Sequence, residues 1–75
     1  MGDKIVKVED AFITIGGYIL SILQKESMPI DNLYKKFLEK YPKKISFEHF
    51  SYAINFLFMI KKIQIKQDDI LEVLL

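Results

Sequence analysis

The sequence predicts a mostly α-helical chain that ends in a small β-hairpin, an α+β fold of 75 residues. Three segments carry apolar residues at the spacing of an amphipathic helix, and a proline or a pair of lysines interrupts the pattern after each one. After position 62, residues 63–66 instead alternate as a strand does, and a polar turn separates them from a second strand that is apolar on both faces. The predicted order is therefore helix, short strand, helix, helix, strand, strand.

The first helix is predicted over residues 9–26, where apolar side chains recur at helical spacing from Phe12 to Leu23. Gly16 and Gly17 fall within this pattern, and each costs roughly 1 kcal/mol relative to alanine in a helix. Because Gly16 lies on the apolar face, we expect another helix to approach closely there. The alternatives are a kink, or a helix that begins only after Gly17.

A short strand is predicted over residues 28–30, because the residue before Pro29 is disfavoured in a helix and pushed towards an extended conformation. The second helix is predicted over residues 31–41 and has one clean apolar face. Asp31 is a suitable N-cap, and Pro42 prevents the helix from continuing.

The third helix, predicted over residues 46–60 with Ser46 as its N-cap, is apolar around too much of its circumference. At about 100° per residue, one side is predicted to form the core face, made of Phe47, Phe50, Ala53, Ile54, Leu57 and Ile60. The other side gathers Glu48, Tyr52, Asn55, Phe56 and Met59. A small chain has limited material to cover both sides, so this second stripe is the main functional clue.

The two last strands are predicted over residues 63–66 and 70–75, on either side of a polar turn that lacks glycine. Three helices followed by a hairpin are the order of a winged helix-turn-helix, α-β-α-α-β-β, with the hairpin as the wing. The chain is too short for a second domain, so we predict one winged-helix domain over residues 1–75. Residues 1–8 are expected to form a tail that is flexible or becomes ordered on a partner.

The composition argues against catalysis and metal binding. The chain has no cysteine and one histidine, which excludes disulfides and thiolate metal sites. His49, early in the third helix, fits a rim residue better than a catalytic base, and no glycine-rich phosphate loop is present. We therefore expect a cytoplasmic protein that is not an enzyme, with no cofactor, no small-molecule substrate and no membrane segment.

Protein binding is the function that the third helix favours. Tyr52, Phe56 and Met59 follow one another at i, i+4 and i+7, a stripe that suits a groove on a partner. Further contacts are predicted outside this helix, at Ile13, Leu20 and Leu74. The apolar strand 70–75 is expected to present an edge that invites pairing. The alternatives are that the stripe packs within the chain, or that it forms a homodimer.

A small DNA-binding regulator is the other candidate function. Five lysines are candidates for weak, salt-sensitive contact with a nucleic-acid backbone: Lys43, Lys44, Lys61, Lys62 and Lys66. The formal net charge is only +1 and arginine is absent, which disfavours direct base readout. Ordinary solvation explains these lysines more simply.

One pattern of residues extends over nearly the whole chain: VEDAFITIGGYILSIL (8–23), PIDNLYKKF (29–37), and SFEHF and AINFLFMI within 46–60, followed by Ile63 and a two-stranded wing. In this pattern the chain resembles one family of small middle components of bacterial ABC three-component systems. The resemblance implies a non-catalytic winged-helix adaptor that links an ABC or SMC-like ATPase to an effector in defence against phages or plasmids. It brings no catalytic residues, and the turn without glycine departs from the expected wing.

Overall fold

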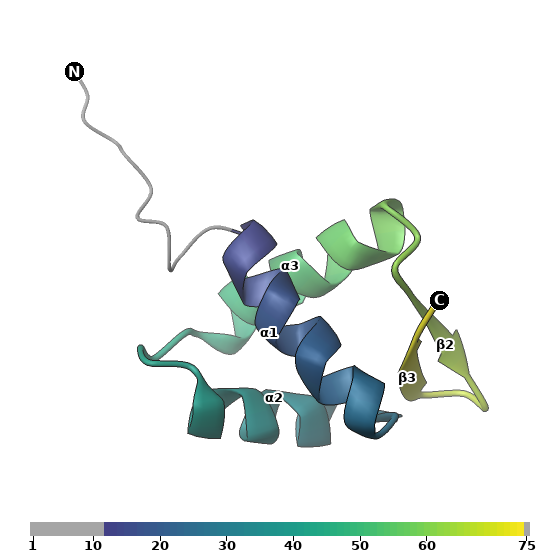
Figure 1. The fold of residues 1–75 in the computed structure, drawn as a ribbon, viewed down its shortest axis with the longest axis horizontal. Coiled ribbons are helices and arrows are strands. Elements are labelled where there is room, and N and C mark those ends of the chain that lie inside the picture. The colour runs from purple at the N-terminus through teal and green to yellow at the C-terminus, as the bar shows by residue number, and fades with distance from the viewer. Residues whose placement is uncertain (1–11, 75) are drawn as a thin grey trace.

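The computed structural model describes residues 12–74, which form three helices and a small three-stranded antiparallel sheet (Figure 1). In chain order the elements are α1 (Phe12–Lys25), β1 (Met28–Pro29), α2 (Ile30–Lys40), α3 (Phe47–Met59), β2 (Ile63–Lys66) and β3 (Ile70–Val73). The α+β class and the predicted order of elements are confirmed. The predictions for residues 1–8, for the start of the first helix at residue 9 and for Leu75 lie outside the described residues.

α1 runs without interruption through its two glycines, which lie in different surroundings. Gly16 is buried, and a Cβ atom placed on it would lie 3.1 Å from Cδ2 of Leu57 in α3. Gly17 is exposed, and a Cβ atom there would meet nothing within 4 Å. The predicted close approach of a helix at Gly16 is confirmed, and the alternative of a helix that begins only after Gly17 is wrong.

α2 begins directly after β1, one residue earlier than predicted. Pro29 occupies the N-cap position in an extended conformation, and no side chain caps the helix. The prediction of Asp31 as N-cap is therefore wrong, because the pairing of β1 with β3 holds the chain extended up to Pro29. Asp31 lies instead in the first turn, where its negative charge favours the positive end of the helix dipole.

α3 begins as predicted, because the backbone N–H of His49 donates a hydrogen bond to Oγ of Ser46 at 3.1 Å. Four of the six predicted core residues are buried: Phe50, Ala53, Ile54 and Leu57. The prediction is wrong for Phe47 and Ile60, which are 42% and 45% exposed. These two residues lie at the two ends of the helix, whereas the buried residues occupy its middle, where α1 crosses it.

The chain leaves α3 through a residue in the left-handed conformation. Lys61 has φ 61°, and its N–H donates to the carbonyl of Phe58 at 3.0 Å. The N–H of Lys62 donates to the carbonyl of Leu57 at 2.9 Å. This pair of bonds is the Schellman motif, which satisfies the last carbonyl groups of a helix and usually has glycine at the left-handed position.

The sheet has the strand order β1-β3-β2, with both pairs antiparallel. β3 is thus the central strand, and the prediction that the last strand presents an edge is wrong. The two-residue strand β1 covers one side of β3, with Met28 opposite Leu71, and β2 covers the other side, with Ile63 opposite Val73. The predicted hairpin of residues 63–66 with the last strand is confirmed.

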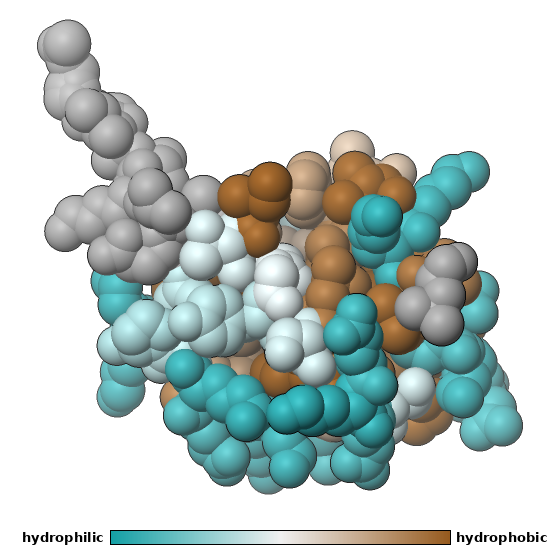
Figure 2. Space-filling model, viewed as in Figure 1, coloured by the Kyte–Doolittle hydropathy of each residue, from teal (hydrophilic) through white to brown (hydrophobic). Residues whose placement is uncertain are grey.

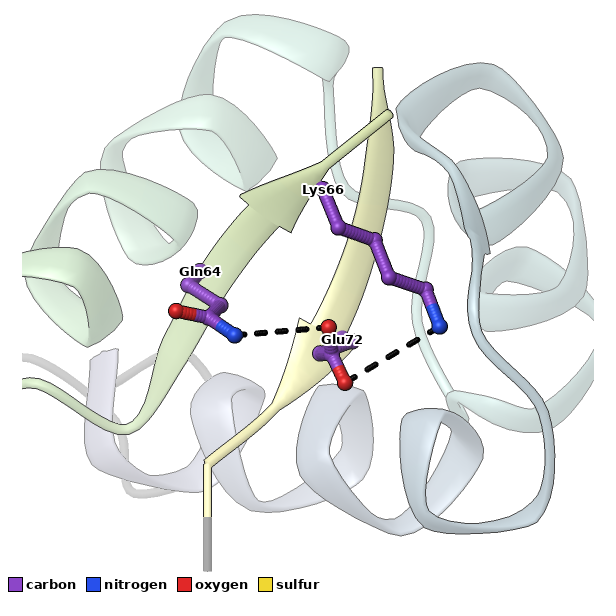
Figure 3. A network of polar contacts seen from close by, with 3 residues as sticks. All are labelled: Gln64, Lys66 and Glu72. Carbon is purple, nitrogen blue, oxygen red and sulfur yellow. Dashed lines mark hydrogen bonds and ion pairs between the residues drawn. The ribbon is translucent and has the colours of Figure 1, made fainter. Parts of the chain in front are cut away.

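The outer face of the hairpin carries a cluster of polar side chains. Nε2 of Gln64 donates to Oε1 of Glu72 at 3.3 Å, and Nζ of Lys66 lies 3.9 Å from Oε2 of the same carboxylate (Figure 3). The turn after Lys66 has positive φ at Gln67 and Asp68, 49° and 75°. The next N–H, of residue 69, donates back to the carbonyl of Gln67 at 2.9 Å, which makes this a γ-turn centred on Asp68.

Phe37 lies at the centre of the hydrophobic core and joins all three helices. It is fully buried, and its ring centroid lies 6.4 Å from that of Tyr18 in α1 and 5.1 Å from that of Phe50 in α3. Tyr41, just after α2, stacks on it at 4.8 Å. On the sheet side, the buried residues Met28, Ile63 and Leu71 close the same core.

Candidate protein-interaction surface

Phe12 connects the first turn of α1 to α3. Its ring centroid lies 6.2 Å from that of Phe56 and 5.6 Å from that of His49, the latter in an edge-to-face arrangement. Phe12 is itself 38% exposed. Phe12 therefore joins the apolar side chains of α3 to the first turn of α1, where Ile13 follows it in the chain.

Three large side chains beside this ring contact are exposed to solvent. Ile13, the neighbour of Phe12 in α1, is 75% exposed, and on α3 Met59 and Tyr52 are 78% and 50% exposed. We call the surface formed by Phe12, Ile13, Tyr52, Phe56 and Met59 the α1/α3 face. Figure 2 shows apolar surface where the start of α1 lies beside α3, extending towards the hairpin. A contiguous apolar patch, unlike single exposed residues, indicates a site of interaction.

Tyr52 is held in place on this surface. Its hydroxyl donates a hydrogen bond to Oε2 of Glu48, one turn earlier in α3, at 2.8 Å. This hydrogen bond, together with the negative charge of the carboxylate, raises the pKa of Tyr52 above its usual value. The tyrosine therefore stays neutral at physiological pH, with its ring fixed beside the apolar residues and its hydroxyl directed towards a carboxylate.

Some of the predicted contact residues are exposed in the structure, and others are half-buried. Tyr52 and Met59 are exposed on α3 as predicted, and Ile13 is exposed on α1. Phe56 is half-buried, because it packs against the core and against Phe12. Two further predicted residues are also half-buried, Leu20 in α1 and Leu74 after β3.

Phe12 belongs to this surface but was not predicted to. It follows the spacing of the buried residues of α1, so the pattern assigns it to the core. Its place in the first turn is the signal that separates it from them, since a residue at the end of a helix is covered on fewer sides. Ile60, at the other end of α3, is exposed for the same reason.

The predicted basic residues do not form one patch. Lys43 and Lys44 precede α3, whereas Lys61 and Lys62 follow it, and a helix of 13 residues places the two pairs about 20 Å apart along its axis. Lys66 belongs to the hairpin, where it lies 3.9 Å from Glu72. Between the two pairs, the exposed part of α3 carries no lysine but Glu48, Tyr52, Asn55 and Met59.

The family of the chain follows from a comparison with protein-family models. The model described as ABC-three component (ABC-3C) system Middle Component 6 matches residues 3–74, nearly the whole chain. The chain belongs to this family. The Middle Component 6 match confirms the resemblance found in residues 8–60. No curated protein and no solved structure matches the chain.

Membership in the Middle Component 6 family means that the chain is one component of a multi-component ABC system. Other proteins therefore act together with it, which agrees with an exposed apolar surface. None of the helices formed by residues 12–74 is long and apolar enough to cross a membrane.

Proposed function

We propose that this chain is a non-catalytic adaptor that links the ATPase of its ABC system to an effector protein in defence against phages or plasmids. The α1/α3 face is the surface that we assign to binding one of these proteins. The observation that carries the proposal is the exposure of Ile13, Tyr52 and Met59 around the contact between Phe12 and Phe56.

The size of these side chains is sufficient for a specific contact. Full burial of a large apolar side chain contributes about 1.5–3 kcal/mol relative to leaving it exposed. Interfaces are centred on such residues, with aromatic residues and methionine enriched and charges depleted. Ile13 and Met59 have the most surface to bury, since they are 75% and 78% exposed.

We further propose that the fold is a winged helix, in which β2 and β3 form the wing. The order of elements, with the strand after the first helix pairing against the last strand, supports this assignment. In a winged helix that binds DNA, α3 would enter the major groove with polar and basic side chains. Here that helix exposes Glu48, Tyr52, Asn55 and Met59. Asparagine can read a base, but none of the four is basic, which favours a protein surface over a phosphate backbone.

The test is co-purification of the chain with the ATPase and effector encoded next to it. Met59→Lys and Ile13→Lys place a charge in the proposed contact, and each is expected to abolish capture of at least one partner. Leu38→Lys is the matched control, since Leu38 is also an exposed apolar residue, 38% exposed, but lies on α2. Phe56→Asp is a poorer probe, because Phe56 packs against the core and its loss would also destabilise the fold.

Unchanged capture of both partners by folded Met59→Lys and Ile13→Lys chains would show that the α1/α3 face is not the binding surface. A homodimer through the same face gives a different result. The parent chain would then have twice the monomer mass in light scattering, and Met59→Lys would reduce it to that of the monomer.

The DNA-binding alternative is tested by measuring affinity for duplex DNA at increasing salt concentration. Proteins that bind the phosphate backbone lose affinity steeply with salt, in proportion to the number of phosphates they neutralise. With its lysines divided between the two ends of α3, the chain is expected to show no useful affinity at physiological salt. Tight binding with a steep salt dependence would favour the regulator.

A further inference from the structure

β2 is an edge strand of the sheet, and no strand formed by residues 12–74 pairs with its outer side. An edge strand presents backbone N–H and C=O groups that can pair with an extended segment of another chain. The opposite edge is weaker, because β1 has only two residues and one of them, Pro29, has no N–H to donate. β2 is therefore the edge that an added strand would use.

The register fixes which backbone groups of β2 face outwards. In an antiparallel pair, residues alternate between those that exchange hydrogen bonds with the partner strand and those that do not. The N–H of Leu74 donates to the carbonyl of Lys62 at 2.7 Å, so the next residue bonded to β3 is Gln64. The N–H and C=O groups of Ile63 and Ile65 therefore point away from β3.

The two faces of β2 differ in what an added strand would meet. Ile63 is buried, and Ile65, on the same face, is 52% exposed. On the opposite face, Gln64 and Lys66 are already engaged with Glu72 (Figure 3). An apolar side chain on the added strand, placed beside Ile65, would cover the exposed apolar surface that this residue leaves.

The charges at this edge determine which kind of added strand is favoured. Residues 61–66 contain three lysines and no acidic residue. If β2 paired with β2 of a second copy about Gln64, Lys62 would face Lys66 of that copy, and like charges opposite each other are destabilising. An acidic residue opposite Lys62 would be favourable, whereas Lys66 already has Glu72 beside it. The edge therefore disfavours self-pairing in this register and favours an acidic partner.

We propose that the β2 edge binds an extended segment of a partner protein, which adds an antiparallel strand to the sheet. The segment carries an apolar residue opposite Ile65 and an acidic residue opposite Lys62. This site lies on the sheet, apart from the α1/α3 face, so it provides a second contact and does not depend on the adaptor proposal.

The probe is an acetylated and amidated peptide, Thr-Val-Thr-Val-Glu-Glu, titrated into the isotopically labelled chain and followed by NMR. The amide signals of Ile63 and Ile65 are expected to shift and their hydrogen exchange to slow, while the amide of Gln64 exchanges slowly from the start. The control peptide, Thr-Val-Thr-Val-Lys-Lys, is expected to bind more weakly.

Two variants separate the backbone and the charge contributions. Ile65→Pro removes an outward N–H without removing a bond to β3, and it is expected to abolish the response. Lys62→Glu is expected to lower the affinity for the acidic peptide about five-fold, because a favourable cross-strand pair becomes a repulsive one. Ile13→Lys, at the start of α1, is expected to leave the response unchanged, which distinguishes failure of this site from failure of the α1/α3 face.

Three results would overturn the proposal. The first is that the amide signals of Ile63 and Ile65 do not shift at millimolar peptide, and the second is that the two peptides bind equally well. The third is that these signals shift with the concentration of the chain alone, which would identify a second copy as the occupant. Should Ile65→Pro unfold the hairpin, Lys62→Glu still decides the question, because the Lys62 side chain is exposed and its hydrogen bonds to Leu57 and Leu74 are made by its backbone.

Discussion

At the scale of single residues, the two adjacent glycines of α1 have different surroundings, and this difference is measurable. Gly17 is exposed with no atom within 4 Å of an added Cβ, so Gly17→Ala gains helix propensity at no steric cost. We expect the free energy of unfolding to rise by about 1 kcal/mol. The midpoint of thermal unfolding should rise by about 4–8 °C, which circular dichroism can follow.

Gly16→Ala is the matched control for this substitution. The added Cβ would lie 3.1 Å from Cδ2 of Leu57, so the Leu57 side chain must shift and part of the gain is lost. An equal gain at both positions would mean that α1 and α3 are not in close contact at Gly16.

Lys61 provides the second prediction at this scale. A non-glycine residue in the left-handed region costs roughly 1–2 kcal/mol, and Lys61 has φ 61°. Lys61→Gly is expected to raise the free energy of unfolding by about 1 kcal/mol, measured by urea denaturation. Lys62→Gly, one residue further on and without positive φ, should give no such gain. A loss of stability in Lys61→Gly would contradict the Schellman motif.

These residues also show what sequence can and cannot predict about backbone conformation. The close packing at Gly16 was predictable, because a costly glycine on an apolar face needs a compensating contact. The position of Lys61 after a helix was also predictable, since a positive charge favours the negative end of the dipole. Its left-handed conformation was not, because lysine has no preference for it and the fold imposes it.

At the scale of elements, Tyr34 holds the connection between α2 and α3. Its hydroxyl donates to the carbonyl of Ile45 at 2.5 Å, while its ring packs edge-on against Phe47, 5.1 Å between centroids. Tyr34→Phe keeps the ring and removes the hydrogen bond. We expect the free energy of unfolding to fall by about 1 kcal/mol, because a partly buried carbonyl loses its donor.

Tyr52→Phe is the control for this prediction. It removes a hydrogen bond of similar length, 2.8 Å to Glu48, but on an exposed surface where water replaces the lost partner. Its stability should stay within about 0.5 kcal/mol of the parent. If the two variants lost stability equally, the bond from Tyr34 would not be what holds this connection.

The elements themselves were largely predictable, and their ends were not. Amphipathic spacing and the prolines locate three helices correctly, since burial of one face is the main force that stabilises them. Asp31 was wrongly chosen as N-cap, because the pairing of β1 with β3 is a contact between distant residues and sets where α2 begins. The central position of β3 depends on the same contact and is equally invisible in the local pattern.

At the scale of the whole molecule, the candidate surface was predictable in outline only. Helical spacing correctly placed Tyr52 and Met59 outside the core, because the period of 3.6 residues fixes the direction of each side chain. It did not foresee that Phe12 would pack on Phe56 and partly bury it. The angle at which two helices cross decides such contacts, and this angle depends on the packing of both helices together.

The final prediction concerns the core that unites the helices. Phe37→Ala removes the ring that contacts Tyr18, Tyr41 and Phe50, and such a substitution typically costs about 3–5 kcal/mol. A chain of 75 residues is expected to have a total stability of only about 4–11 kcal/mol. One substitution thus removes much of the free energy that keeps the chain folded.

Because residues of all three helices belong to one core, the loss of this ring is expected to destabilise the helices together, so that Phe37→Ala still unfolds in a single transition. Denaturation followed by far-ultraviolet circular dichroism and by tyrosine signals should give coincident transitions at lower urea concentration than in the parent. Leu38→Ala, next to Phe37 but 38% exposed, is the control and should cost clearly less stability than Phe37→Ala. Separate transitions for the helices would contradict a shared core, and would place the α1/α3 face on elements that can move independently.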